Sequence, residues 1–196
     1  MLAFDHPPIR TARLTLRPLT EADVGPLFAI HSDPATMRYW STPTWTDDER
    51  GRQMVARDRD PALTDFLRLG IELTETGALL GTCSFFGIIA QCGRAELGYM
   101  LGAPAWGKGY MQEALVAFLD FGFTHLNLNR IEADTDPRNA RSLQLLERLH
   151  FVKEGHFRER WVVGGEVSDS AMYGLLRRDW PSRNPPSPAM AGKEEA

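Results

Sequence analysis

The sequence predicts a mixed α/β fold in which helices pack against a sheet. Three strand-like runs follow one another between residues 65 and 101 with only short turns between them, as in an antiparallel meander. The helix that follows carries apolar residues at helical spacing, so it offers a complete stripe to a sheet. Along the chain the order is strand, two helices, three strands, helix, strand, helix and two strands, which is a mixed layer architecture.

The N-terminal region contributes the first strand and two helices. Residues 13–19, RLTLRPL, alternate in polarity as a strand does. Thr20 is the expected N-cap of the first helix. The apolar face of this helix consists of Val24, Leu27, Phe28 and His31. A second helix, polar enough to lie on the surface, is expected after Thr46 in TDDERGRQMVARDRD.

The middle of the chain holds the meander and the most regular helix. The strands are DFLRLGIEL (65–73), LLGTCSFFGII (79–89) and RAELGYML (94–101), with the turns TETG and AQCG between them. The apolar stripe of the next helix consists of Met111, Ala114, Leu115, Phe118, Leu119 and Gly122, at i, i+3, i+4, i+7, i+8 and i+11. This spacing predicts packing on the sheet.

The C-terminal third completes the sheet. RIEADTD from Arg130 is expected to be a strand, and NARSLQLLERLHF from Asn139 a short helix. Two last strands, FVKEGHFRERWVV and EVSDSAMYGLLR, meet at the turn Gly164–Gly165. After Trp180 the proline-rich, polar segment predicts a disordered tail over 181–196. Residues 1–180 are then one domain, because 196 residues suit a single core.

Composition and charge exclude several classes of protein. A hydrophobic content of 43% and a charged content of 24% are ordinary for a globular protein, and the net charge of −4 argues against a nucleic-acid-binding surface. Two cysteines without a CxxC predict neither a disulfide framework nor a zinc site, so no metal is expected. The N-terminus MLAFDHPPIR lacks the apolar run of a signal peptide, and no stretch approaches the ~20 apolar residues of a membrane span. We therefore expect a cytoplasmic protein without a membrane partner.

Two glycines at the head of the central helix suggest a ligand. APAWGKGYMQEAL from Ala103 places Gly107 and Gly109 where glycine costs backbone entropy. The first turn of a helix has unpaired N–H groups and the positive end of the helix dipole, and glycines let an anion approach them. Lys108 would add a positive charge. The pattern indicates an anion site or a tight turn; the spacing is neither that of a P-loop nor that of a Rossmann fingerprint.

Several blocks of the sequence together resemble a known superfamily. AELGYML, AWGKGYMQEAL and RIEADTDPRNARSLQLLERLHFVKEG resemble the GNAT acyl-CoA-dependent N-acyltransferases. The opening strand at 13–19 and the closing hairpin from Gly155 to Trp180 resemble the branch that includes the RimJ/RimL ribosomal-protein N-terminal acetyltransferases. The resemblance spans about residues 10 to 180. It implies a twisted, mostly antiparallel sheet of about seven strands, about four helices, and a splayed parallel pair of strands.

The resemblance also implies acetyl-CoA as cosubstrate and assigns its contacts. Backbone groups of Tyr99, Met100 and Leu101 would hold the pantetheine arm and the acyl carbonyl. Asn139 would contact the arm, and the hydroxyl of Ser142 would contact the coenzyme near the thioester sulfur. The pyrophosphate would be held by Trp106, Gly107, Lys108, Gly109, Tyr110 and Met111. The superfamily pattern Q/R-x-x-G-x-G/A is changed here, with Trp106 for Gln/Arg and Met111 for a small residue. The tryptophan is usual in the branch that the chain resembles, and a cradle of backbone N–H groups should tolerate Met111 if its side chain points to the sheet.

The implied reaction is direct attack of an amine on the acyl carbon, with coenzyme A thiolate leaving. By family position Ser142 is the candidate proton donor, and Glu96 and Glu132 are candidate bases. Deprotonation at pH 7 costs about 1 kcal/mol for an α-amine of pKa 7.7–8.0 and roughly 4.6 kcal/mol for a lysine of pKa 10.4. A site without a strong base therefore favours an α-amine, such as a peptide N-terminus, although small-molecule amines also qualify.

Each candidate also has an ordinary structural explanation. Glu96 and Glu132 could form ion pairs, Ser142 could pack in its helix, and Asn139 could cap it. The remaining candidates are Arg141 for the 3′-phosphate of the coenzyme, Trp40, Trp45 and Trp161 for an acceptor pocket, and Asp169 for substrate orientation. For these, and for His31 and Cys83, solvent exposure, packing or turn closure is the simpler explanation.

Three functions remain open on the sequence alone. An acetyltransferase leads, a non-catalytic acyl-CoA sensor would keep the same coenzyme residues, and a third possibility is an acyltransferase with a larger donor such as succinyl-CoA. Segments 22–60 and 156–169 are expected to shape the acceptor pocket. The terminal hairpin could pair two copies into a homodimer.

Overall fold

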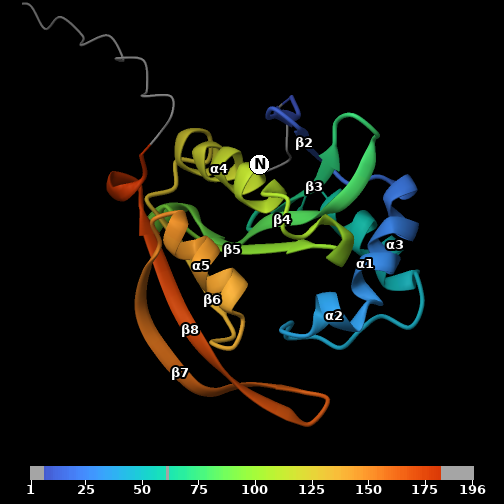
Figure 1. The fold of residues 1–196 in the computed structure, drawn as a ribbon. Helices are drawn as coiled ribbons and strands as arrows, with labels where there is room; N and C mark the ends of the chain where they lie inside the picture. The colour runs from blue at the N-terminus through green and yellow to red at the C-terminus, as the bar shows by residue number, and fades with distance from the viewer. Residues whose placement is uncertain (1–6, 61, 182–196) are drawn as a thin grey trace, which may run out of the picture.

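The computed structural model describes residues 7–60 and 62–181. Its eight strands join one sheet in the order β1-β2-β3-β4-β5-β6-β8-β7 (Figure 1). The strands are β1 (Ile9–Arg10), β2 (Leu14–Arg17), β3 (Leu67–Leu73), β4 (Ala78–Ile89), β5 (Arg94–Leu101), β6 (Arg130–Thr135), β7 (Val152–Val163) and β8 (Glu166–Leu176). Every neighbouring pair is antiparallel except β5 and β6. The predicted fold class is therefore confirmed.

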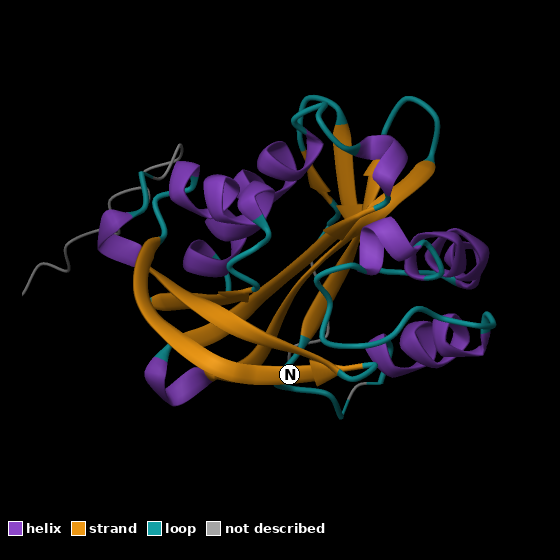
Figure 2. Ribbon diagram, turned by 60° about the horizontal axis from the view of Figure 1, so that its bottom comes forward, coloured by secondary structure: helices purple, strands orange, loops and turns teal. Residues whose placement is uncertain are grey.

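Five α-helices cover the sheet, which is strongly twisted with helices on both faces (Figure 2). They are α1 (Val24–His31), α2 (Pro34–Met37), α3 (Glu49–Asp58), α4 (Tyr110–Thr124) and α5 (Ala140–Arg148). Sequence reasoning missed the short α2, although its signal is present. Asp33 caps its N-terminus by accepting hydrogen bonds from two backbone N–H groups, and Pro34 follows at the first helical position.

The helices α4 and α5 pack on one face of the sheet, in the main hydrophobic core. The predicted stripe of α4 is buried apart from Met111, which is half-buried. Phe118 of α4 stacks on Phe85 of β4 with ring centroids 4.1 Å apart. Gly122 allows this contact, because a Cβ there would lie 2.7 Å from the Phe85 ring. Packing of β4 against α4 thus fixes α4 on the sheet.

The helices α1, α2 and α3 belong to two smaller clusters on the other face. One cluster buries Trp45 among residues of α1 and α3, and the other packs α1 and α2 against Met100 of β5. Along β5 the alternation is consistent with these two faces, since Ala95, Leu97 and Leu101 belong to the main core. The central strand β5 therefore separates two different environments.

The parallel strands β5 and β6 separate along their length. Their register has three pairs only, of which the last is Glu96 with Glu132. From Leu97 to Leu101, β5 pairs with β4 alone. On the far side of the opening, β6 continues to Thr135 paired with β8 alone. The splayed parallel pair is confirmed, and it leaves one edge of β5 without a strand partner.

The long β7–β8 hairpin projects beyond the rest of the sheet (Figure 1). Its register shifts between Phe157 and Trp161, where Glu159 takes a left-handed φ of 52°. Asp169 holds this bulge, because its carboxylate accepts from the Glu159 N–H at 2.8 Å and contacts His156 Nε2 at 2.8 Å. Asp169 therefore stabilises the hairpin.

The C-terminal tail predicted from the sequence lies almost entirely outside the described residues. Of the predicted tail only Pro181 is described; residues 182–196 lie outside the described ranges. Within the described part of the chain, no helix is long and apolar enough to cross a membrane.

Candidate functional site

The glycine turn before α4 depends on two left-handed backbone positions. Gly107 has φ 76° and Gly109 has φ 77°, a conformation that L side chains rarely adopt. A Cβ added to Gly107 would meet nothing within 4 Å. The glycines are thus required by the backbone conformation and not by crowding within the protein.

This conformation leaves a row of backbone donors free. Among the described residues, the N–H groups of residues 107–112 find no hydrogen-bond acceptor, and the ladder of α4 begins only with Glu113 N donating to Gly109 O at 3.1 Å. Unpaired N–H groups at the positive end of a helix are a ready-made anion site. The 15 residues of α4 supply the dipole. The turn can therefore bind a phosphate or pyrophosphate through its backbone.

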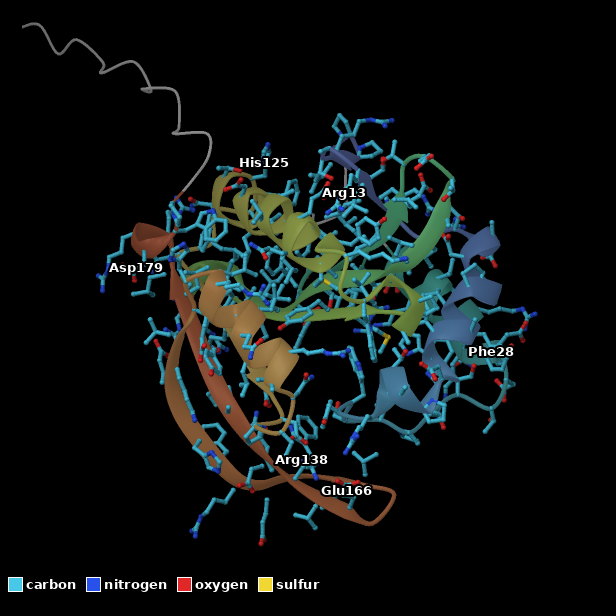
Figure 3. All side chains as sticks on the ribbon, in the orientation of Figure 1. Arg13, Phe28, His125, Arg138, Glu166 and Asp179 are labelled. Carbon is cyan, nitrogen blue, oxygen red and sulfur yellow. The ribbon has the colours of Figure 1, made fainter. Side chains whose placement is uncertain are left out.

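Arg13 holds this turn in place (Figure 3). Its Nη1 donates to Lys108 O at 3.0 Å, its Nε donates to Glu113 at 2.7 Å, and its guanidinium lies 4.6 Å from the Tyr110 ring centroid. Burial alone would raise the pKa of Glu113, but hydrogen bonds from Thr11 and Arg13 lower it, so the carboxylate stays charged. Sequence reasoning placed Arg13 in a strand only, because nothing local marks a contact across 95 residues.

Trp106 joins the turn to its two neighbours. Its indole Nε1 donates to Leu101 O at 2.7 Å, at the end of β5. The guanidinium of Arg141, on α5, lies 5.1 Å from the centroid of the same indole. Arg141, a candidate for the 3′-phosphate, is thus beside the turn, and the Leu101 carbonyl already accepts one hydrogen bond.

A hydrogen bond connects β5 and α5. The Tyr99 hydroxyl and Ser142 Oγ are 2.7 Å apart. Asn139 is the N-cap of α5, where its Oδ1 accepts from Ser142 N at 3.2 Å. Burial raises the pKa of Tyr99 to about 12, so its phenol is neutral at physiological pH. Two hydroxyl groups in contact can pass a proton toward a leaving group. The sequence predicts a role in coenzyme binding for the backbone of Tyr99 and none for its hydroxyl group.

The two carboxylates proposed as bases differ in their partners. Glu96 and Glu132 are opposite one another in the β5–β6 register, so both side chains project from the same face of the sheet. Glu132 accepts hydrogen bonds from Arg94 and, at 2.7 Å, from Arg130. Glu96 forms no ion pair with any described residue. Of the two candidate bases, Glu96 is therefore the one whose carboxylate has no guanidinium partner among the described residues.

The three tryptophans proposed for the acceptor pocket, and His31, lie on the face of α1–α3 or on the hairpin. His31 is buried and stacks on Trp45 with ring centroids 4.0 Å apart. Trp40 packs beside Met100 of β5. Trp161 on β7 donates its Nε1 to Ser170 Oγ at 3.1 Å. Packing explains Trp45 and His31, whereas Trp40 lies close to the opening of β5.

Neither cysteine is placed for chemistry, and no metal cluster is visible in what the structure describes. Cys83 is fully buried and burial raises the pKa of its thiol, whereas Cys92 is exposed. Among residues 7–60 and 62–181, no three His, Cys, Asp or Glu side chains are grouped to hold a metal ion.

The chain is similar to known proteins in both sequence and structure. Residues 13–152 match the acetyltransferase (GNAT) domain family. The chain is 41% identical to the uncharacterized N-acetyltransferase p20 of Bacillus licheniformis, over 87% of this chain and 96% of that relative. It is 34% identical to the [ribosomal protein uS5]-alanine N-acetyltransferase of Escherichia coli, over 52% of this chain and 53% of the relative. The crystal structure of spermidine N-acetyltransferase from Vibrio cholerae in complex with CoA and spermine has a TM-score of 0.78 at 23% identity, covering 86% of this chain and 98% of that one. That last likeness concerns the fold.

Proposed function

Because this chain belongs to the GNAT family, in its RimJ/RimL-like branch, and is an N-acetyltransferase, we propose that it moves the acetyl group of acetyl-CoA to a primary amine by direct attack in a ternary complex. The observation that carries the proposal is the row of unpaired N–H groups at residues 107–112, beside the opening between β5 and β6. The acceptor is a peptide or protein N-terminus or a small-molecule amine.

The coenzyme lies across these two features. Its pyrophosphate accepts hydrogen bonds from the N–H groups at 107–112, with the exposed Lys108 side chain as an added positive charge. Its pantetheine arm lies along residues 97–101, the edge of β5 that has no strand partner. The Leu101 carbonyl is already engaged by Trp106, so Tyr99 and Met100 offer the freer backbone. Asn139 keeps its amide N–H groups for the arm, because its Oδ1 is used as the cap of α5.

The chemistry then needs two proton movements. The amine lone pair attacks the thioester carbonyl carbon, a C–N bond forms, the C–S bond breaks, and the thiolate leaves with a proton from Ser142. Tyr99 orients Ser142 and supplies a neutral phenol behind it. Glu96 takes the proton of the amine, directly or through water. Glu132 is the weaker candidate because two guanidinium groups occupy its carboxylate.

Acetyl-CoA-dependent thiol release tests the proposal on a panel of amines: N-terminal peptides, lysine peptides, polyamines, aminoglycosides and amino acids. Turnover is expected with one class. Glu96→Gln should lower kcat about 100-fold, as is typical for loss of a general base. Its pH profile should shift to follow the acceptor itself, near pKa 7.7–8.0 for an α-amine. Ser142→Ala and Tyr99→Phe should lower kcat without changing the Kd of acetyl-CoA.

The other outcomes are equally clear. If acetyl-CoA binds and no amine reacts, even with a succinyl donor, the chain is a coenzyme-binding protein without this activity. If Glu96→Gln leaves the pH profile unchanged, Glu96 is not the base. Failure to bind coenzyme A would mean that the glycines mark only a turn.

A further inference from the structure

A hollow of about 370 Å³ opens on the face of α1 and α3, away from the glycine turn. Its walls include His31 of α1, Trp40 and Trp45 of the following segment, Arg50 and Arg57 of α3, and Arg68 of β3. None of these residues belongs to the proposed coenzyme site. This set, which we call the arginine hollow, gathers three guanidinium groups in a chain of net charge −4.

The guanidinium groups of the arginine hollow are incompletely paired. Arg68 is held by Asp58, with Nη1 3.0 Å from the carboxylate, and lies 4.8 Å from the Phe66 ring centroid. Arg57 lies over the same ring at 4.5 Å. Within residues 7–60 and 62–181, neither Arg50 nor Arg57 forms an ion pair with a carboxylate. The hollow is therefore lined by more guanidinium groups than carboxylates pair with, and guanidinium groups suit a carboxylate ligand.

Three aromatic rings also line the hollow. His31 and Trp45 stack at an interplanar angle of 8°, and Trp40 meets the His31 ring edge-on with centroids 6.3 Å apart. His31 is only 7% exposed, and its buried Nδ1 has no hydrogen-bond partner among the residues that the structure describes. Aromatic walls beside arginines fit a ligand with an apolar or aromatic body next to its anionic group.

The arginine hollow lies within reach of the opening at β5. Arg68 pairs with Ser84 of β4, and Ser84 pairs with Gly98 of β5, so the three lie in one row across the sheet. Two strand spacings separate Arg68 from Gly98, about 10 Å. Gly98 lies two residues beyond Glu96, the last β5 residue that pairs with β6. Trp40, in turn, packs against the cluster of Ile30, Met37 and Met100, of which Met100 belongs to β5.

We propose that the arginine hollow binds the anionic end of the acceptor, so that the preferred acceptor is a primary amine carrying a carboxylate next to an apolar or aromatic group. This inference rests on the proposed function and names its acceptor class. A dipeptide fits the span, since two extended residues cover about 7 Å and the arginine side chains reach further. A polyamine, with positive charge at both ends, does not fit.

The test compares glycylphenylalanine with glycylphenylalanine amide. Both have the same amine and the same ring, but the C-terminal group is a carboxylate in the first and a neutral amide in the second. We expect kcat/KM to be about 10- to 100-fold higher for the free acid, the range of a hydrogen bond to a charged group. Arg50→Gln and Arg57→Gln should each remove most of that ratio. Arg52→Gln is the matched control, because Arg52 is on the same helix but does not line the hollow and is bonded to Asp48.

A binding measurement separates this inference from the proposed function. Calorimetric titration of N-acetylglycylphenylalanine and its amide, in the presence of coenzyme A, needs no turnover. Tighter binding of the acid that is lost in Arg50→Gln and Arg57→Gln supports the hollow, even if no amine is acetylated. Turnover with equal kcat/KM for acid and amide, unaffected by both variants, overturns the hollow and leaves the enzyme proposal intact. Preference for spermidine over either dipeptide overturns it too.

Discussion

The two faces of the sheet are built for recognition in different ways. On the face of α4 and α5, the candidate coenzyme site consists mainly of main-chain groups, namely the N–H row at 107–112 and the free edge of β5. On the face of α1–α3, the arginine hollow consists of side chains from three separate elements. A backbone site depends on a few φ angles and tolerates changes such as Met111, whereas a side-chain site changes with each residue that lines it. Conserving the first while varying the second would allow one fold to keep its donor and change its acceptor.

The largest expected effect is on the pH dependence of folding stability, and it comes from His31 on the face of α1–α3. Burial, together with the charge of Arg68, lowers the pKa of His31 to about 4, below its ordinary 6.5. Between about pH 4 and pH 6.5 the native state therefore binds fewer protons than the unfolded state. Stability is complete above pH 6.5 and is lost as pH falls toward 4, by up to about 3 kcal/mol. Urea unfolding of His31→Phe should show a flatter pH dependence than the parent.

The control for this measurement is His150→Asn, at an exposed position whose φ of 65° suits asparagine. It removes an imidazole that lies outside the face of α1–α3, so the comparison isolates the loss of His31 from the loss of a histidine as such. Equal slopes for the parent and His31→Phe would show that His31 titrates normally in the native state, and would contradict the closed packing of this face.

A substitution in the glycine turn is expected to act next most strongly. Gly107→Val places a β-branched residue at φ 76°, which disfavours the binding conformation by about 2 kcal/mol. The Kd of acetyl-CoA should rise roughly 30-fold at 1.36 kcal/mol per tenfold. Gly77→Val is the matched control, since Gly77 has φ 71° and equally open surroundings but lies in the β3–β4 turn. If both variants weaken acetyl-CoA binding equally, the turn before α4 is not the coenzyme site.

Removing the anchor of the turn should have a smaller effect. Arg13→Leu loses the side-chain hydrogen bonds to Lys108 O and to the Glu113 carboxylate; of these, the bond to Lys108 O holds the turn directly. We expect the KM of acetyl-CoA to rise about 10-fold with kcat at saturation unchanged, as for one lost hydrogen bond to a charged group. Arg52→Leu removes a comparable exposed ion pair on α3 and should leave this KM as it was. A fall in kcat with an unchanged KM would instead connect Arg13 to the chemical step.

The smallest effect separates the two roles of Asn139. Asn139→Ala removes the cap of α5 and should cost about 1 kcal/mol of unfolding free energy. Asn139→Asp keeps an oxygen acceptor for Ser142 N and should restore stability. If the amide N–H groups also contact the coenzyme, both variants weaken acetyl-CoA binding. If only Asn139→Ala weakens it, Asn139 acts through the helix alone.

Local patterns were sufficient for most of the secondary structure. The strand at 94–101 has the predicted bounds, and α4 buries the predicted stripe apart from Met111, because alternation and helical spacing reflect which face is apolar. The β1 strand escaped detection because two residues carry no periodicity. The α2 helix was too short for an apolar stripe, so only its cap could have revealed it.

The sequence by itself determined most of the elements, the family, and the glycine turn with its free N–H groups, since each depends on residues adjacent in the chain. Only the tertiary structure decided that Arg13 holds Lys108, that Tyr99 meets Ser142, and that three arginines share a hollow with three aromatic rings. These contacts join residues up to 95 positions apart. Such distances in sequence are closed by the twist and packing of the sheet, which no local pattern records.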